Sequence, residues 1–258
     1  MFADRCFRDV PCSSQLVKVN TMRQDQFDSV IRAMCAEVDR LGNESLAWEY
    51  LPEADLIYEM ALCTFSSQSV FELAGAMADR LRDDGLLCEQ SFISHGDGYR
   101  AAIDKAFHRP VVFFSNGTER SAMPRFGKRL PSFLYATVSN IHGNGGSLKS
   151  LLLASTSARH ARGALIATVS GFGPKQASMF LRRVGYSSDL AIVDRHIVDY
   201  LKVFRGIDVN EATLSRLTGY EAVEDELRVL ALDFGYSLGC VDLATWLTMR
   251  VAKQIGLL

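Results

Sequence analysis

The stretch Val169-Ser-Gly-Phe-Gly-Pro-Lys-Gln-Ala-Ser178 separates two short segments with apolar faces. Gly171 and Gly173 allow backbone conformations that a Cβ would forbid, so the chain can reverse direction tightly between them. Pro174 suits the first turn of the next helix, because the amide hydrogen that it lacks has no helical partner there. Free N–H groups at a helix start attract phosphate. The pattern predicts a helix-hairpin-helix, a motif that binds a nucleic-acid backbone without reading sequence. An ordinary αα-hairpin is the alternative.

Apolar residues recur at helical spacing along most of the remaining chain. Residues 55–83 carry them at intervals of three, four and their sums. The same period recurs in 158–169, 174–184, 195–204, 222–234 and 242–254. Extended structure is indicated only in Arg109-Pro-Val-Val-Phe-Phe114, which has no evident pairing partner. We therefore expect an all-α fold.

The composition is that of a globular protein. The chain has 258 residues, 48% hydrophobic and 22% charged, enough for one or two domains with a sizeable core. No apolar run approaches the roughly 18 residues of a membrane span, and the first residues lack the apolar core of a signal peptide. Six cysteines are scattered without a CxxC motif. These features predict a reduced, cytoplasmic protein, nucleoid-associated if it is prokaryotic.

Charge is distributed unevenly along the chain. The formal net charge is −2. Residues 99–205 hold 16 basic and 5 acidic side chains, a net charge of +11, whereas 1–98 hold 8 and 17 (−9) and 206–258 hold 4 and 8 (−4). Either the middle segment forms a polyanion-binding face, or the charges cluster by chance on solvated helix surfaces.

Two adjacent stretches carry a family resemblance. Gly171-Phe-Gly-Pro-Lys-Gln-Ala-Ser-Met-Phe-Leu-Arg-Arg-Val-Gly185 and Leu190-Ala-Ile-Val-Asp-Arg-His196 resemble the helix-hairpin-helix DNA glycosylases. The most similar branch is that of the archaeal and bacterial 8-oxoguanine DNA glycosylase/AP lyases. The resemblance implies that Lys175 is the nucleophile and Asp194 its catalytic partner.

The residue types suit this chemistry. A lysine amine attacks only when unprotonated, and positive charge nearby favours that form. The sequence places Lys175 in the first turn of a helix, where the dipole is positive, with Arg182 and Arg183 as further positive charges. The amine would attack the sugar C1′, release the base and leave a Schiff base that β-eliminates. Asp194 would stabilise positive charge on the sugar. The alternatives are a solvated surface lysine and a simple N-cap.

The resemblance also assigns binding roles. Gly171, Gly173 and His196 would contact the DNA backbone, and Gln68, at the end of the segment from Glu59, would fill the gap left by a flipped base. Asp242 and Trp246, one helical turn apart in Val241-Asp-Leu-Ala-Thr-Trp246, would form the base pocket. Phe126 is assigned to the pocket from its place in the basic run Arg125-Phe-Gly-Lys-Arg129, where it would stack on the DNA or the flipped base. An N-cap aspartate, a core tryptophan and a packed loop phenylalanine are the structural alternatives.

The main hypothesis is a monomeric bifunctional DNA glycosylase/AP lyase that excises an oxidised purine, 8-oxoguanine first, from double-stranded DNA without a metal or organic cofactor. The resemblance implies two helical lobes with the active site in the cleft between them. Residues 56–189 would form a helical barrel ending in the hairpin, and 1–55 and 190–258 the other lobe. The branch often ends in a lysine, whereas this chain ends Gln254-Ile-Gly-Leu-Leu258. Another modified base, for example in phage DNA, and a non-catalytic DNA-binding module are the rival hypotheses.

Overall fold

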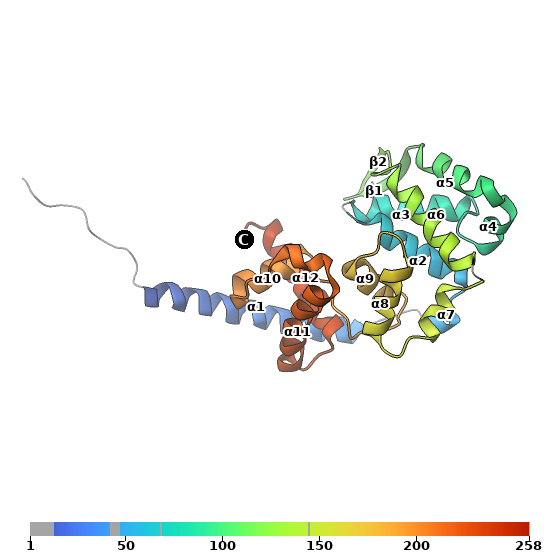
Figure 1. Cartoon of the computed structure of the whole chain (residues 1–258). Helices are drawn as coiled ribbons and strands as arrows, with labels where there is room; N and C mark the ends of the chain where they lie inside the picture. The colour runs from blue at the N-terminus through green and yellow to red at the C-terminus, as the bar shows by residue number, and fades with distance from the viewer. Residues whose placement is uncertain (1–12, 42–46, 68, 144, 258) are drawn as a thin grey trace, which may run out of the picture.

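The computed structural model describes residues 13–41, 47–67, 69–143 and 145–257, with side chains from residue 24 onward. Figure 1 shows two helical lobes that lie beside each other. Each lobe has its own hydrophobic core: one cluster of buried residues runs from Trp48 to Leu190, and the other joins Ile31 and Cys35 to residues 191–249. The predicted all-α class is confirmed, since the described residues form one small sheet of two strands and are otherwise helical or irregular.

The larger lobe is a compact array of helices around the first core. It begins with the 3-10 turn Trp48–Tyr50 and includes a second such turn, Gly96–Gly98. Its helices are α2 (Glu53–Phe65), α3 (Phe71–Asp83), α4 (Glu89–His95), α5 (Tyr99–Phe107), α6 (Arg129–His142), α7 (Leu148–Leu153), α8 (Ala158–Thr168) and α9 (Pro174–Arg183).

The smaller lobe combines the N-terminal helix with the C-terminal helices. It consists of α1 (Ser13–Leu41), α10 (Arg195–Arg205), the 3-10 turn Glu211–Ser215, α11 (Leu217–Phe234) and α12 (Leu238–Gln254). Asp28 of α1 accepts hydrogen bonds from Tyr200 (2.7 Å) and Arg205 (3.0 Å) of α10, so segments far apart in sequence share one core. No helix among the described residues is long and apolar enough to cross a membrane.

A buried ion pair joins the two lobes. Arg162 of α8 donates to both carboxylate oxygens of Glu224 on α11, at 2.6 and 3.1 Å, and neither side chain is accessible to solvent. Glu224 also accepts the backbone N–H of Ala191, at 3.0 Å, where the chain passes between the lobes. Because the two opposite charges are buried and hydrogen-bonded to each other, this pair connects α8 to α11.

The structure corrects two details of the sequence prediction. The extended stretch 109–114 does have a partner: β1 (Val111–Ser115) pairs antiparallel with β2 (Thr118–Ala122), with Val112 opposite Ser121. β2 was missed because its sequence Thr-Glu-Arg-Ser-Ala lacks alternating apolar residues, and its first four residues are exposed. The helical period over 55–83 belongs to two helices, since α2 ends at Phe65 and α3 begins at Phe71.

Candidate active site

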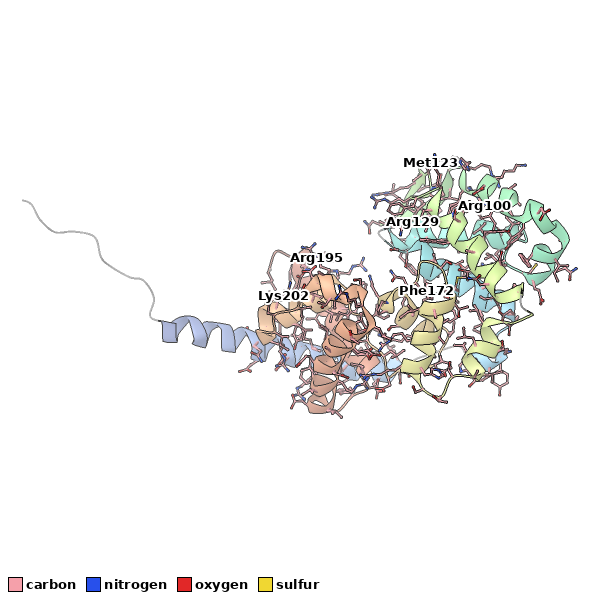
Figure 2. All side chains as sticks on the ribbon, viewed as in Figure 1. Arg100, Met123, Arg129, Phe172, Arg195 and Lys202 are labelled. Carbon is pink, nitrogen blue, oxygen red and sulfur yellow. The ribbon has the colours of Figure 1, made fainter. Side chains whose placement is uncertain are left out.

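The predicted hairpin connects α8 to α9. Gly171 has φ = +87°, a conformation that L side chains rarely adopt, and the Phe172 side chain between the two glycines is buried against Phe180, with ring centroids 6.3 Å apart. Figure 2 shows Phe172 on the side of its lobe that faces the other lobe. α9 begins at Pro174, and Lys175 is its second residue. The Lys175 side chain is exposed and has no hydrogen-bond or ion-pair partner in the described part of the chain.

Asp194 caps the N-terminus of α10. Its Oδ1 accepts the backbone N–H groups of His196 (2.8 Å) and Ile197 (3.1 Å). The N-cap role proposed as an alternative is therefore real. It occupies one carboxylate oxygen, and Oδ2 has no hydrogen-bond partner among the residues described. The cap fixes the carboxylate, so one oxygen is held and the other is available.

Tyr220 of α11 holds the segment that leads into α10. The hydroxyl of Tyr220 donates to the carbonyl of Ala191 and accepts the N–H of Val193, both at 2.9 Å. Ser178 of α9, three residues after the lysine, accepts instead from Nη1 of Arg162, at 3.2 Å, the arginine that pairs with Glu224 of α11. α11 thus holds the residues just before Asp194 through Tyr220, and contacts α9 through Arg162.

Asp242 is buried at the junction of the lobes. It is 3% exposed, and its Oδ2 is paired with Nη1 of Arg182 on α9, whose Nη2 donates to the carbonyl of Gly239 at 2.8 Å. Oδ1 has no partner among the described residues. Burial raises the pKa of Asp242 to about 6, opposed by Arg182 and assisted by the negative charge of Asp194. Asp242 is not an N-cap, because Ser237 caps α12.

Trp246 and His196 face each other beside Asp242. Their ring centroids are 6.1 Å apart in an edge-to-face arrangement, and the guanidinium of Arg250 lies 5.0 Å from the centroid of the tryptophan ring. Trp246 is only partly buried. Burial lowers the pKa of His196, although nearby Asp194 opposes this, and its Nδ1 has no partner within the described residues. The structure thus brings Asp194, His196, Asp242 and Trp246 together.

Phe126, the third predicted pocket residue, has no described contact with this group. Phe126 lies in the loop before α6, with φ = +55° and 42% of its side chain exposed. Its carbonyl accepts the N–H groups of Arg129 (2.8 Å) and Leu130 (3.0 Å), and no described hydrogen bond or ring contact connects it to Asp194 or Trp246. Gln68 lies outside the described residues.

Comparison with known proteins identifies the family. A family model described as 8-oxoguanine DNA glycosylase matches residues 118–236. An 8-oxoguanine DNA glycosylase/AP lyase from Sulfurisphaera tokodaii is 32% identical over 160 residues, which are 61% of this chain and 74% of that protein. The chain belongs to the 8-oxoguanine DNA glycosylase family.

Other 8-oxoguanine DNA glycosylases resemble this chain in sequence over a shorter stretch, or in fold. A relative from Saccharolobus islandicus is 42% identical over 79 residues, but these are 30% of this chain and only 37% of the relative's length. The fold resembles that of the Methanocaldococcus jannaschii 8-oxoguanine glycosylase/lyase in complex with 15mer DNA containing 8-oxoguanine, with a TM-score of 0.56 and 21% identity over 94% of this chain and 98% of that one.

Two parts of the site in this 8-oxoguanine DNA glycosylase family member were not expected from sequence. Arg182 and Arg183 were expected to add charge near Lys175, but carboxylates pair with both: Arg182 with Asp242, and Arg183 with Glu59 at 2.6 Å. Tyr220 was not singled out, because its hydroxyl acts on backbone groups 27 and 29 residues away. No local spacing indicates such contacts.

Proposed function

We propose that this protein is a bifunctional DNA glycosylase/AP lyase that excises 8-oxoguanine from double-stranded DNA. The observation that carries the proposal is the arrangement of two helix starts: Lys175 is in the first turn of α9 after the glycine hairpin, and Asp194 caps α10. Family membership and the names of the relatives, 8-oxoguanine DNA glycosylase/AP lyases, support it. A DNA substrate is compatible with a cytoplasmic location, at the nucleoid if the cell is prokaryotic.

The proposed glycosylase step uses the free amine of Lys175. The amine lone pair forms a bond to the sugar C1′ while the bond from C1′ to the base nitrogen breaks, and the base leaves with that electron pair. Positive charge develops on the sugar as the base departs, and the fixed carboxylate of Asp194 stabilises it. The N-cap hydrogen bonds pre-orient this carboxylate, so little reorganisation is needed during the reaction.

The proposed lyase step follows from the covalent intermediate. Opening of the sugar ring at C1′ converts the lysine adduct to a Schiff base with a protonated nitrogen. Loss of a proton from C2′ then expels the 3′ phosphate and breaks the strand on that side of the lesion. Hydrolysis of the remaining imine returns Lys175 to its amine form. These steps require no reactant other than the protein, the DNA and water.

The other predicted residues have binding roles in this proposal. Asp242 would hydrogen-bond the edge of a flipped base through its unpartnered oxygen, and Trp246 would stack on it. The ion pair of Asp242 with Arg182 and the ring contact of Trp246 with His196 support this assignment. These contacts hold the carboxylate and the indole ring in fixed positions. Gly171, Gly173 and His196 would contact the DNA backbone, Phe126 would stack on the DNA or the flipped base, and Gln68 would fill the gap in the stack.

Borohydride trapping tests the proposal. The full chain is incubated with duplexes that carry 8-oxoguanine, another modified base or no lesion, and borohydride reduces any Schiff base to a stable adduct. We expect an adduct with the 8-oxoguanine duplex that is absent for Lys175→Gln. Trapping only on a different base would support the rival glycosylase. Equal binding of all duplexes with no adduct would support a non-catalytic DNA-binding module.

A further inference from the structure

More than half of the cations in the basic middle segment are paired with carboxylates, most of them from the two ends of the chain. Of its sixteen lysines and arginines, nine form salt bridges with carboxylates. These nine are Arg100, Arg109, Arg159, Arg162, Arg182, Arg183, Arg195, Lys202 and Arg205. The net charge of +11 along the sequence is therefore not the charge that a ligand meets, and the cations without a carboxylate are the ones that matter.

Two of those remaining cations are neighbours at the start of α6. Lys128 and Arg129 are both exposed, and neither has a hydrogen bond or ion pair from its side chain within the described ranges. The first turn of α6 contains no acidic residue either. Two adjacent positive charges at the positive end of a helix dipole oppose folding slightly, so their place is better explained by an anion bound from outside.

Arg129 is held in place by an aromatic ring. Its guanidinium carbon lies 4.9 Å from the centroid of the Phe133 ring, one turn further along α6. Stacking on a ring reduces the rotamer freedom of an arginine without using its N–H donors. The five donors of Arg129 thus stay available in a partly ordered side chain, which suits bidentate binding of a phosphate.

The same phenylalanine contacts the helix-hairpin-helix. A Cβ on Gly171 would lie 2.7 Å from Cε2 of Phe133, so the ring lies directly on the hairpin glycine. A second contact fixes the alignment: the backbone N–H of Ser170 donates to the hydroxyl of Thr137, at 2.9 Å, one turn beyond Phe133. Figure 2 shows Arg129 on the side of its lobe that faces the other lobe, near Phe172 of the hairpin.

We propose that Lys128 and Arg129 form a second phosphate-binding site beside the hairpin, which engages the backbone of the duplex held for excision. The inference rests on the proposed function, because it takes DNA as the ligand. The hairpin binds one part of the backbone, and the cations at the start of α6 bind the part that passes over Phe133. Phosphate contacts of this kind set the position of the protein on the duplex and carry no sequence information.

The salt dependence of binding tests this site. Fluorescence anisotropy with a labelled 8-oxoguanine duplex, and with an undamaged one, gives the dependence of log K on log salt for the full chain. Each phosphate contact contributes about 0.9 to that slope. We expect Lys128→Gln and Arg129→Gln each to reduce the slope by about one and to weaken binding on the order of tenfold at low salt.

Arg109→Gln is the matched control. It removes the same charge from the same lobe, but Arg109 is already paired with Asp84 at 3.0 Å, so the slope should stay at the wild-type value. Arg129→Lys keeps the charge without the planar fork and should keep the slope while lowering the affinity. Wild-type slopes for both Lys128→Gln and Arg129→Gln would overturn the inference, as would an equal loss in Arg109→Gln.

Trapping separates this inference from the proposed function. At limiting enzyme, Lys128→Gln and Arg129→Gln should form less borohydride adduct than the wild type, and the yield should rise with enzyme concentration, because the residues bind DNA but do not touch the reacting atoms. Unchanged slopes with normal adducts would overturn the second phosphate site and leave the glycosylase proposal intact. Reduced slopes in a protein whose wild-type form gives no adduct would support the phosphate site and contradict the glycosylase proposal.

Discussion

Arg162 of α8 and Glu224 of α11 form two hydrogen bonds, of 2.6 and 3.1 Å, across the junction of the lobes, with both side chains inaccessible to solvent. Removing one member of such a pair leaves an unpaired charge in a low-dielectric interior. Glu221 of α11 also accepts from Nη2 of Arg162, at 2.8 Å, but Glu224 is the one carboxylate among the described residues that accepts from Nη1, so Glu221 does not replace it.

Glu224→Gln should therefore reduce the free energy of unfolding by about 3 kcal/mol. Asp233→Asn on the same helix is the control, because Asp233 pairs with Arg32 in an exposed site and its loss should cost less than about 1 kcal/mol. Urea denaturation of both variants measures the difference. Equal, small losses would show that the buried pair does not hold the lobes together.

Gly171→Ala should destabilise the hairpin, whereas Gly173→Ala should not. Gly171 has φ = +87°, and a Cβ there would displace the Phe133 ring, so we expect a loss of about 2 kcal/mol. Gly173 has φ = −109°, and its Cβ would meet only the amide oxygen of Gln176, at 3.5 Å. Denaturation midpoints compare the two alanine variants, and similar midpoints would contradict the conformational argument.

Asp194→Asn separates capping from catalysis. Asparagine caps helices about as well as aspartate, so the free energy of unfolding should change by less than about 0.5 kcal/mol. The excision rate should fall on the order of 100- to 1,000-fold, because the neutral amide cannot stabilise positive charge on the sugar. Single-turnover excision of 8-oxoguanine measures this. A variant that is fully active would restrict Asp194 to its structural role.

Asp242 should make stability depend on pH in a defined direction. Burial raises its pKa from the usual 3.8 to about 6 in the folded protein, so the folded state holds the proton more tightly than the unfolded state. Its stabilising contribution is complete below about pH 4 and is lost as the pH rises through 6. Relative to Asp242→Asn, the wild type should lose about 2–3 kcal/mol of unfolding free energy between pH 4 and 7. Parallel curves for the two proteins would contradict this.

The hairpin could be predicted from sequence because its determinants are local. Two glycines, a proline and the apolar residues around them specify a turn between helices within ten residues, and α8 and α9 lie within a residue of their predicted bounds. Asp194 and His196 were likewise predicted as site residues from one short stretch, Leu190-Ala-Ile-Val-Asp-Arg-His196. The helical spacing of apolar residues in 195–204 also predicted α10, which places Ile197, Leu201 and Phe204 in the core.

The contacts that organise the site could not be predicted, because they join distant segments. Arg182 and Asp242 are 60 residues apart, and Arg162 and Glu224 are 62 apart. The sequence shows none of these partners: Arg182 was interpreted as a charge near Lys175 and Asp242 as a pocket residue, and neither prediction included their ion pair. The net charge of +11 for residues 99–205 overstated the exposed positive charge for the same reason. A sum along the sequence does not show which acidic side chains pair with which cations in the fold.

The identity of the covalently bound residue tests the central claim most directly. The borohydride-reduced complex of the wild-type chain with 8-oxoguanine duplex is digested with protease and nuclease, and the modified peptide is sequenced by mass spectrometry. The account predicts a reduced sugar adduct on Nζ of Lys175, in the peptide that follows the hairpin, with Lys149 and Lys202 unmodified. An adduct on a different lysine, or on no lysine although the strand is cut, would contradict it.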